Sequence, residues 1–174
     1  VATDDDRIRT HAKAFGAVHI VDIGLDQHYI NTIQSKYDLV DQALASSILV
    51  IRNAYSHKGD HGHALLLAGS SGKMGAAILA AKALLRSGAG LLSCLIPGQG
   101  LTILQAAFPE AMAIIAGDEF LSGELPLLDG YKTIGCGPGM GTHPATALLL
   151  NQVLDIYNRP MVIDADAINM LPKN

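Results

Sequence analysis

The sequence lacks any cluster of lysine and arginine residues, and this absence excludes one class of partner. Its 174 residues include 12 Lys and Arg against 16 Asp and Glu, a formal net charge of −4 at pH 7. A nucleic-acid-binding face needs basic residues that displace counterions from phosphates. We therefore expect no nucleic-acid partner, whereas backbone N–H groups can still bind a small anionic ligand.

Cysteines and long apolar runs are also scarce. Cys94 and Cys136 are the two cysteines, and neither belongs to a CxxC pair. The sequence therefore predicts neither a disulfide framework nor a zinc site, and it favours a cytoplasmic location. The longest apolar stretch, residues 76–85, is interrupted by Lys82 and is too short to cross a bilayer. Because a signal-peptide pattern is also missing, we expect no membrane partner.

Charged residues make up 16% of the chain and aromatic residues 5%, whereas 49% of the residues are hydrophobic. This composition excludes a disordered chain and fits layers of helices and strands. From His63 onward, apolar runs typical of strands alternate with segments typical of helices. The alternation predicts an α/β fold, a largely parallel sheet with helices on both faces. Strands are expected at residues 63–69, 91–96, 111–115, 131–136 and 160–164, and helices at residues 75–88, 101–107 and 144–157.

The N-terminal part has weaker signals. A β-branched run predicts a strand at residues 18–23, and residues 40–49 have the apolar spacing of a short helix. Two polar stretches, residues 31–38 and 52–63, are candidate domain boundaries. We place the boundary in the first, and because the chain has no initiator Met we expect it to begin inside a longer polypeptide. The predicted domains are residues 1–35 and 36–174.

The first candidate functional motif is LLLAGSSGKMGAA, residues 65–77. It reads as a strand, a glycine-rich turn and the start of a helix. A Walker A loop is excluded, because only two residues separate Gly69 from Gly72-Lys73, whereas that motif needs four. In addition, Met74 occupies the position where the motif has a Ser or Thr hydroxyl. The turn either presents the N–H groups of a helix N-terminus to a ligand or is purely structural. Lys73 is expected to be a solvated turn residue.

The second motif, GCGPGMGTHP at residues 135–144, has four glycines around one proline after a predicted buried strand. Glycines let the backbone approach a ligand closely, so the motif predicts a binding loop. Thr142 is expected to cap the following helix.

The third motif is VIDADAIN, residues 162–169. Asp164 and Asp166 are spaced i, i+2 at a strand end, where both can point to one side and bind a metal, a hydroxyl or a neighbouring backbone group. Equally, Asp166 can cap the helix that begins there. With Asn169, they are candidate substrate or metal contacts.

The histidines carry a weaker signal. His61 and His63 share one face if the strand begins early, but there is no thiolate or third histidine at ligand spacing, so a zinc site is not favoured. His57 and Lys58 either contact a phosphate or are simply solvated.

These motifs occur together and in a defined order. SHKGDHGHALLLAGSSGKMGAAILAAKALLRSGAGLLSCLIP, FPEAM, IGCGPGMGTH and VIDADAIN resemble the ADP/ATP-dependent NAD(P)H-hydrate dehydratase family over residues 50–174. Upstream, GAVHIVDIGLDQHYI resembles the last strand and tail of the NAD(P)H-hydrate epimerase domain that precedes the dehydratase in bifunctional repair enzymes.

The resemblance implies a ribokinase-like fold and a lyase. In this family ADP or ATP, with Mg²⁺ expected, phosphorylates the hydroxyl of hydrated NADH or NADPH, and elimination of phosphate restores the reduced ring. The resemblance places contacts to the hydrated dinucleotide at Ala76 or Ala77 and at Gly139 or Gly141. Small residues suit these positions, because larger side chains would fill the space of the ligand.

The resemblance is incomplete. The family's HPGE-type segment, its lysine-containing nucleotide loop and its late G-S/T-G-D motif find no match before Asn174, and catalytic residues of the epimerase would lie before Val1. We therefore expect no catalytic residue in this chain and no activity from it alone, together with a sheet left open at one edge. The alternatives are a ribokinase-like kinase of a small vitamin precursor and a non-catalytic nucleotide-binding module. A homo-oligomer is compatible with the composition.

Overall fold

The computed structural model describes residues 21–34, 40–49 and 52–171. The chain divides into two compact units, Val1–Arg52 and Asn53–Asn174. This division falls at the start of the second polar stretch. The assignment of residues 1–35 and 36–174 to two domains of different function stays a prediction.

Within residues 21–34 and 40–49, the described part of the first unit, there are two short helices, each capped by an aspartate. Asp26 precedes α2 (Gln27–Thr32), and its carboxylate accepts hydrogen bonds from two N–H groups of the first turn. Asp41 precedes α3 (Gln42–Ile48), and its carboxylate accepts one, from Leu44. The helix expected within residues 40–49 is thus present, and none of its residues is buried. Of the strand expected at residues 18–23, the first three residues lie outside the described residues and the last three have no regular secondary structure.

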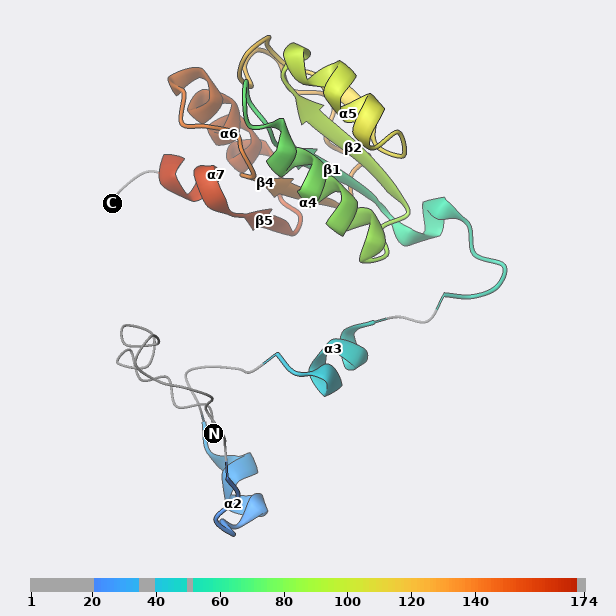
Figure 1. The fold of residues 1–174 in the computed structure, drawn as a ribbon, viewed down its shortest axis with the longest axis vertical. Coiled ribbons are helices and arrows are strands. Elements are labelled where there is room, and N and C mark those ends of the chain that lie inside the picture. Colours follow the sequence, from blue (N-terminus) through green and yellow to red (C-terminus); the bar gives the residue numbers. More distant parts are fainter. Residues whose placement is uncertain (1–20, 35–39, 50–51, 172–174) are drawn as a thin grey trace. The chain divides into compact units, whose positions relative to one another are not determined.

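The second unit is a three-layer α/β structure around a five-stranded parallel sheet of order β3-β2-β1-β4-β5 (Figure 1). The predicted fold class is therefore confirmed. Each element predicted from His63 onward is present, with bounds that differ by no more than two residues. The elements are η2 (Lys58–His61), β1 (His63–Leu67), α4 (Met74–Arg86), β2 (Leu91–Ile96), η3 (Gly98–Gly100), α5 (Leu101–Ala107), β3 (Met112–Ile115), β4 (Thr133–Cys136), α6 (Pro144–Ile156), β5 (Met161–Ile163) and α7 (Ala165–Met170).

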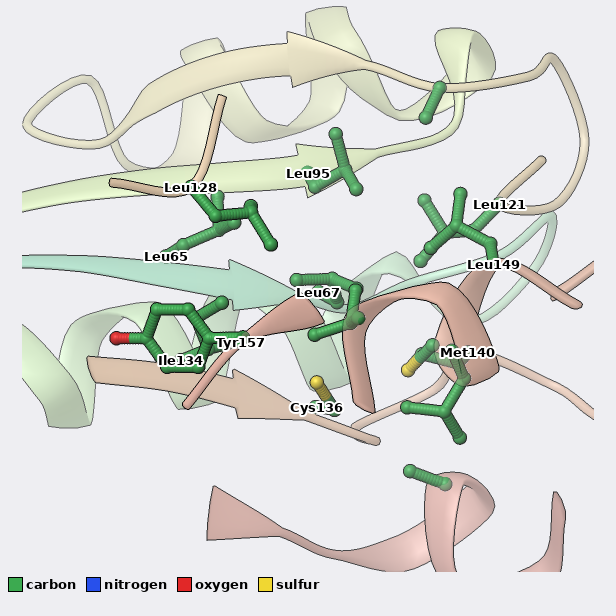
Figure 2. Close-up of a cluster of buried hydrophobic side chains, with 14 of the residues drawn as sticks. Leu65, Leu67, Leu95, Leu121, Leu128, Ile134, Cys136, Met140, Leu149 and Tyr157 are labelled. Atoms are coloured by element: carbon green, nitrogen blue, oxygen red, sulfur yellow. The ribbon is translucent and has the colours of Figure 1, made fainter. Parts of the chain in front are cut away.

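The central strand, β1, is buried on both faces, which explains its continuous apolar sequence. Ala64 and Leu66 pack in a cluster with residues of α4 and α5, whereas Leu65 and Leu67 pack on the opposite face with residues of α6. Figure 2 shows this second cluster. Burial of each leucine side chain contributes about 1.5–3 kcal/mol. The cluster also includes Leu95, Leu121, Ile134, Met140, Leu149, Leu150, Val153 and Tyr157.

The strand order defines where a ligand would bind. From β1 the chain proceeds through β2 to β3 on one side, and then returns to place β4 and β5 on the other side. The order therefore reverses between β1 and β4, and a crevice opens at the carboxyl ends of such neighbouring strands. The two glycine-rich motifs of the sequence directly follow these two strands.

Both edge strands carry exposed apolar side chains. On β3, Met112 and Ile115 are 44% and 46% exposed, and on β5 Val162 is 65% exposed. Unpaired strand edges of this kind are templates for pairing with further chain segments. Among the helices that the structure describes, none has the length and apolarity required to cross a membrane.

The two cysteines provide a test of the core. Cys94 and Cys136 are buried free thiols, and burial raises the pKa of each from 9.0 to about 12. Near neutral pH this lowers the thiolate fraction by about a thousand-fold, and the thiolate is the reactive form. We expect a disulfide reagent to label neither cysteine in the folded chain and both in urea, with rates that differ at least about a thousand-fold. Rapid labelling without denaturant would contradict the buried position of these strands.

Candidate functional site at the carboxyl edge of the sheet

Three segments meet at the carboxyl edge of the sheet. They are the turn at residues 68–73 after β1, the loop at residues 137–143 after β4, and residues 164–166 after β5. Because β1, β4 and β5 are adjacent and parallel, their carboxyl ends lie side by side. The structure thus brings together the three motifs that the sequence singled out.

The turn after β1 is bonded directly to the loop after β4. The backbone N–H of Gly69 donates to the carbonyl oxygen of Pro138 at 2.9 Å, and the hydroxyl of Ser70 donates to the carbonyl oxygen of Gly139 at 2.8 Å. Ser70 is only 8% exposed. These bonds occupy carbonyl groups of the loop, so the two segments form one surface.

The two candidate glycines of the loop have different surroundings. Both have a positive φ, +67° at Gly139 and +70° at Gly141, which favours glycine. A Cβ at Gly139 would lie 2.7 Å from the carbonyl oxygen of Lys73 and 3.1 Å from the Cβ of Ala76, whereas at Gly141 the nearest atom is the Ser70 Oγ at 3.6 Å. Gly139 is therefore required for close packing against the start of α4, and Gly141 borders more open space.

The two candidate alanines of α4 also differ. Ala76 is half-buried and faces Gly139, whereas Ala77 is completely buried in the core cluster between α4 and the sheet. A ligand on this surface reaches the first more readily than the second. The contact itself stays a prediction.

The acidic motif after β5 has one residue that joins the site. Asp164 is at the N-cap of α7, but its exposed side chain makes no capping hydrogen bond. Asp166 lies in the first turn of α7, and its Oδ2 accepts the backbone N–H of Gly141 at 2.8 Å. The same oxygen forms an ion pair with Lys73 Nζ at 3.4 Å. Asn169 is exposed on α7.

These contacts bear on two expectations, the role of Asp166 and that of Lys73. The Asp166 carboxylate accepts a hydrogen bond from a neighbouring backbone group, which is one of the partners expected from the sequence. It does not cap its own helix. Lys73 is 54% exposed, yet it is also an ion-pair partner and not merely a solvated turn residue.

No metal site is found in the part of the chain that the structure describes, because it contains no group of three His, Cys, Asp or Glu residues that could hold an ion. The histidines have other partners. His61 bonds to Ser56 at 2.9 Å and His63 to Ser93 at 3.0 Å, and burial lowers the pKa of His63. His57 pairs with a carboxylate of its own turn, on Asp60, at 3.4 Å.

The cap of α6 differs from the sequence prediction. The N-cap is His143, whose Nδ1 accepts the backbone N–H of Ala145 at 3.2 Å, so the expected capping role of Thr142 is wrong. The His143 ring stacks on Phe120, from the loop after β3, with centroids 3.6 Å apart. The contact joins a fourth segment to this edge of the sheet, and no local pattern of the sequence indicated it.

A cavity of about 490 Å³ lies elsewhere, near the amino ends of β4 and β5. It is lined by residues 125–129 and 156–159, the segments that precede β4 and β5. It therefore does not coincide with the glycine loops.

The fold belongs to a known structural class. A ribokinase-like superfamily protein from Enterococcus faecalis superposes with a TM-score of 0.63 at 23% identity, over 77% of this chain and 50% of that protein. The chain has a ribokinase-like α/β fold. A family model described as NAD(P)H-hydrate dehydratase matches residues 64–174, so the chain belongs to the NAD(P)H-hydrate dehydratase family, a family of lyases. The resemblance inferred from the motifs is thereby confirmed.

Several relatives agree with this assignment. The chain is 34% identical over 168 residues to the bifunctional NAD(P)H-hydrate repair enzyme Nnr of Moorella thermoacetica, covering 92% of this chain and 32% of the relative. It is 38% identical over 132 residues to the ADP-dependent (S)-NAD(P)H-hydrate dehydratase of Lactiplantibacillus plantarum, covering 74% and 46%. The ADP/ATP-dependent NAD(P)H-hydrate dehydratase from Bacillus subtilis, co-crystallized with ATP/Mg²⁺, superposes with a TM-score of 0.63 at 32% identity, over 72% and 44% of the two chains. The chain thus spans 32–46% of the length of these relatives.

Proposed function

We propose that this chain supplies the hydrated-dinucleotide side of an ADP/ATP-dependent NAD(P)H-hydrate dehydratase. The supporting observation is the family match over residues 64–174, which contains both glycine-rich segments at the point where the strand order reverses. In the proposed reaction a phosphoryl group is transferred from the nucleotide to the ring hydroxyl, and the phosphate then leaves to restore the reduced ring.

The proposed substrate contacts are Ala76, Gly139 and Gly141. The hydrogen bonds from Gly69 and Ser70 already occupy two carbonyl groups of the loop. The surface formed by the turn after β1 and the loop after β4 therefore offers a ligand mainly space beside small residues. A dinucleotide needs such space, since any added side chain would take its place.

We propose that ADP or ATP, together with Mg²⁺, is bound mainly by sequence that the longer relatives possess. The Bacillus subtilis relative was co-crystallized with ATP/Mg²⁺, and this chain covers 44% of it. The chain is accordingly expected to bind substrate without turning it over.

The N-terminal part is proposed to be the tail of an epimerase-like domain, at residues 1–35. Matches to bifunctional repair enzymes cover 92% and 94% of this chain, whereas matches to ADP-dependent dehydratases cover 78% and 74%. The difference is expected if the first part of the chain has its counterpart only in the bifunctional relatives. Cytoplasmic location and homo-oligomer formation stay predictions.

The proposal is tested by restoring the remaining sequence. A chimera joins this chain, after Asn174, to the part of the Bacillus subtilis dehydratase that lies beyond the aligned region. Incubated with hydrated NADH, Mg²⁺ and ADP or ATP, the chimera should recover NADH absorbance. The chain alone should not, although hydrated NADH should shift the NMR signals of Gly139 and Gly141.

The same experiment separates the alternatives. If neither nucleotide supports recovery of NADH by the folded chimera, and hydrated NADH leaves the two glycine signals unchanged, the dehydratase proposal fails. Phosphorylation of a hydroxymethylpyrimidine or thiazole alcohol would then favour the vitamin-precursor kinase. ATP binding without any turnover would favour a non-catalytic module.

A further inference from the structure

We infer that Asp166 is a positioning residue, whose carboxylate holds the glycine loop at residues 137–143 in place, with Lys73 as its counter-charge. The inference depends on the proposed function only for the identity of the ligand, hydrated NAD(P)H. The contacts among these residues do not depend on it.

The carboxylate joins three segments that are distant in sequence. Asp166 lies on α7, Gly141 in the loop after β4 and Lys73 in the turn after β1. One oxygen, Oδ2, accepts from Gly141 N at 2.8 Å and lies 3.4 Å from Lys73 Nζ. A hydrogen bond from a backbone N–H to a charged acceptor is stronger than one between neutral groups.

Different contacts anchor the two ends of the loop. At its start, Pro138 and Gly139 accept bonds from the turn after β1. Towards its other end the bond from Gly141 to Asp166 is one anchor, and the stacking of His143 on Phe120 is another. Packing holds the neighbours of Gly141, because Met140 is completely buried in the core and His143 makes this stacking contact. At Gly141 itself a Cβ would meet no atom closer than Ser70 Oγ at 3.6 Å. The carboxylate therefore adds a polar contact that orients the Gly141 peptide group, beside the packing of its neighbours.

The burial of the three groups fits a positioning role. The Asp166 side chain is 24% exposed, so its bonds are partly shielded from water, whereas Lys73 is 54% exposed. An ion pair with so exposed a partner contributes little by itself. The bond to Gly141 is therefore expected to be the main interaction, and the lysine mainly compensates the charge.

The backbone next to Asp166 is also unusual. Ala165 has φ +46°, the one positive value among the non-glycine residues that the structure describes. This conformation is costly for alanine and occurs where the surroundings enforce it. Ala165 is the first residue of α7 and stands directly before the residue whose carboxylate reaches Gly141.

NMR of the isotope-labelled 174-residue chain tests the inference. In the unmodified chain, a scalar coupling across the hydrogen bond should connect Gly141 ¹⁵N with the side-chain carboxyl carbon of Asp166. The corresponding coupling from Gly69 to the carbonyl carbon of Pro138 serves as the positive control. If the control coupling is detected and the coupling to Asp166 is absent, the inference is overturned.

Variants add a second readout. In Asp166→Ala, exchange of the Gly141 amide hydrogen should accelerate roughly ten- to hundred-fold, because the charged acceptor is lost. Asp166→Asn, which keeps a neutral acceptor, should restore part of the protection. Lys73→Gln should change the rate by less than about five-fold, as expected for an exposed ion pair. Equal acceleration in Asp166→Ala and in the matched variant Asp164→Asn would overturn the inference.

Measuring the affinity for hydrated NADH distinguishes a failure of this inference from a failure of the proposed function. If Asp166 positions the binding surface, hydrated NADH should bind more weakly to Asp166→Ala than to the unmodified chain, and Asp166→Asn should recover part of the affinity. If the coupling is present but hydrated NADH binds neither form, the positioning contact stands and the proposed ligand fails. Unchanged affinity in Asp166→Ala would overturn the positioning role.

Discussion

Replacement of Gly137 by alanine is expected to lower the free energy of unfolding by about 2–6 kcal/mol, a large part of the roughly 5–15 kcal/mol typical of a domain. Gly137 follows β4 and has φ +136°. A Cβ at this position would overlap the carbonyl group of Asp164, at the end of the neighbouring strand β5. Because the obstacle is backbone, the two strand ends would have to separate, which strains the hydrogen bond from Asp164 N to the carbonyl oxygen of Cys136.

Urea unfolding followed by far-UV circular dichroism measures this loss, since the chain contains no tryptophan. Gly72→Ala is the matched control, because Gly72 also has a positive φ, +77°, but a Cβ there meets nothing within 4 Å. Its cost should be limited to the backbone strain, about 1–2 kcal/mol. Gly75→Ala, in the first turn of α4 and also in open space, should stabilise the chain by about 0.5–1 kcal/mol. Equal losses for Gly137→Ala and Gly72→Ala would contradict the steric explanation.

The sheet could be predicted from the sequence because its signals are local. The apolar run of β1 and the alternation of strands with helices depend on neighbouring residues, and burial on both faces leaves few other arrangements. The glycine loops were found for a similar reason, since each follows a predicted strand. What the sequence could not provide was the bond between Ser70 and Gly139, which joins residues 69 positions apart.

The errors have physical causes. Thr142 has the better capping propensity, but Pro144 occupies the first turn of α6, and a proline there sets the preceding residue in the extended conformation of an N-cap. That signal was present in the sequence and favours His143. The six-residue helix α2 was missed because its sequence is too short to show a period, and its start depends on the Asp26 cap.

The role of Asp166 was open in the sequence for a different reason. A carboxylate after a strand suits a metal, a substrate hydroxyl or a backbone N–H equally well, so its type does not identify its partner. The partner is fixed by the packing of β5 beside β4, which brings Gly141 within 2.8 Å. Such a contact becomes visible only when the strand order is known.

Replacement of Ala76 by leucine should reduce kcat/KM of the chimera for hydrated NADH roughly 10²-fold, with little change in stability. The Ala76 Cβ faces Gly139 at the meeting point of the two glycine-rich segments. The larger side chain must either displace the loop or occupy the space proposed for the dinucleotide. A shift of about 1 Å at a binding surface can cost 10²-fold in rate. Leucine is a good helix former, so α4 itself should tolerate the change.

Two leucine variants of the same helix control for this result. Ala83 lies two turns further along the same face and is exposed, so Ala83→Leu should retain the activity of the unmodified chimera. Ala77 is completely buried, so Ala77→Leu should instead lower the free energy of unfolding by about 1–3 kcal/mol through overpacking. Steady-state kinetics and urea unfolding of the three variants therefore separate a steric effect on the ligand from an effect on the fold. If Ala76→Leu keeps kcat/KM within about three-fold, which is under 1 kcal/mol, the substrate does not approach α4 at this residue.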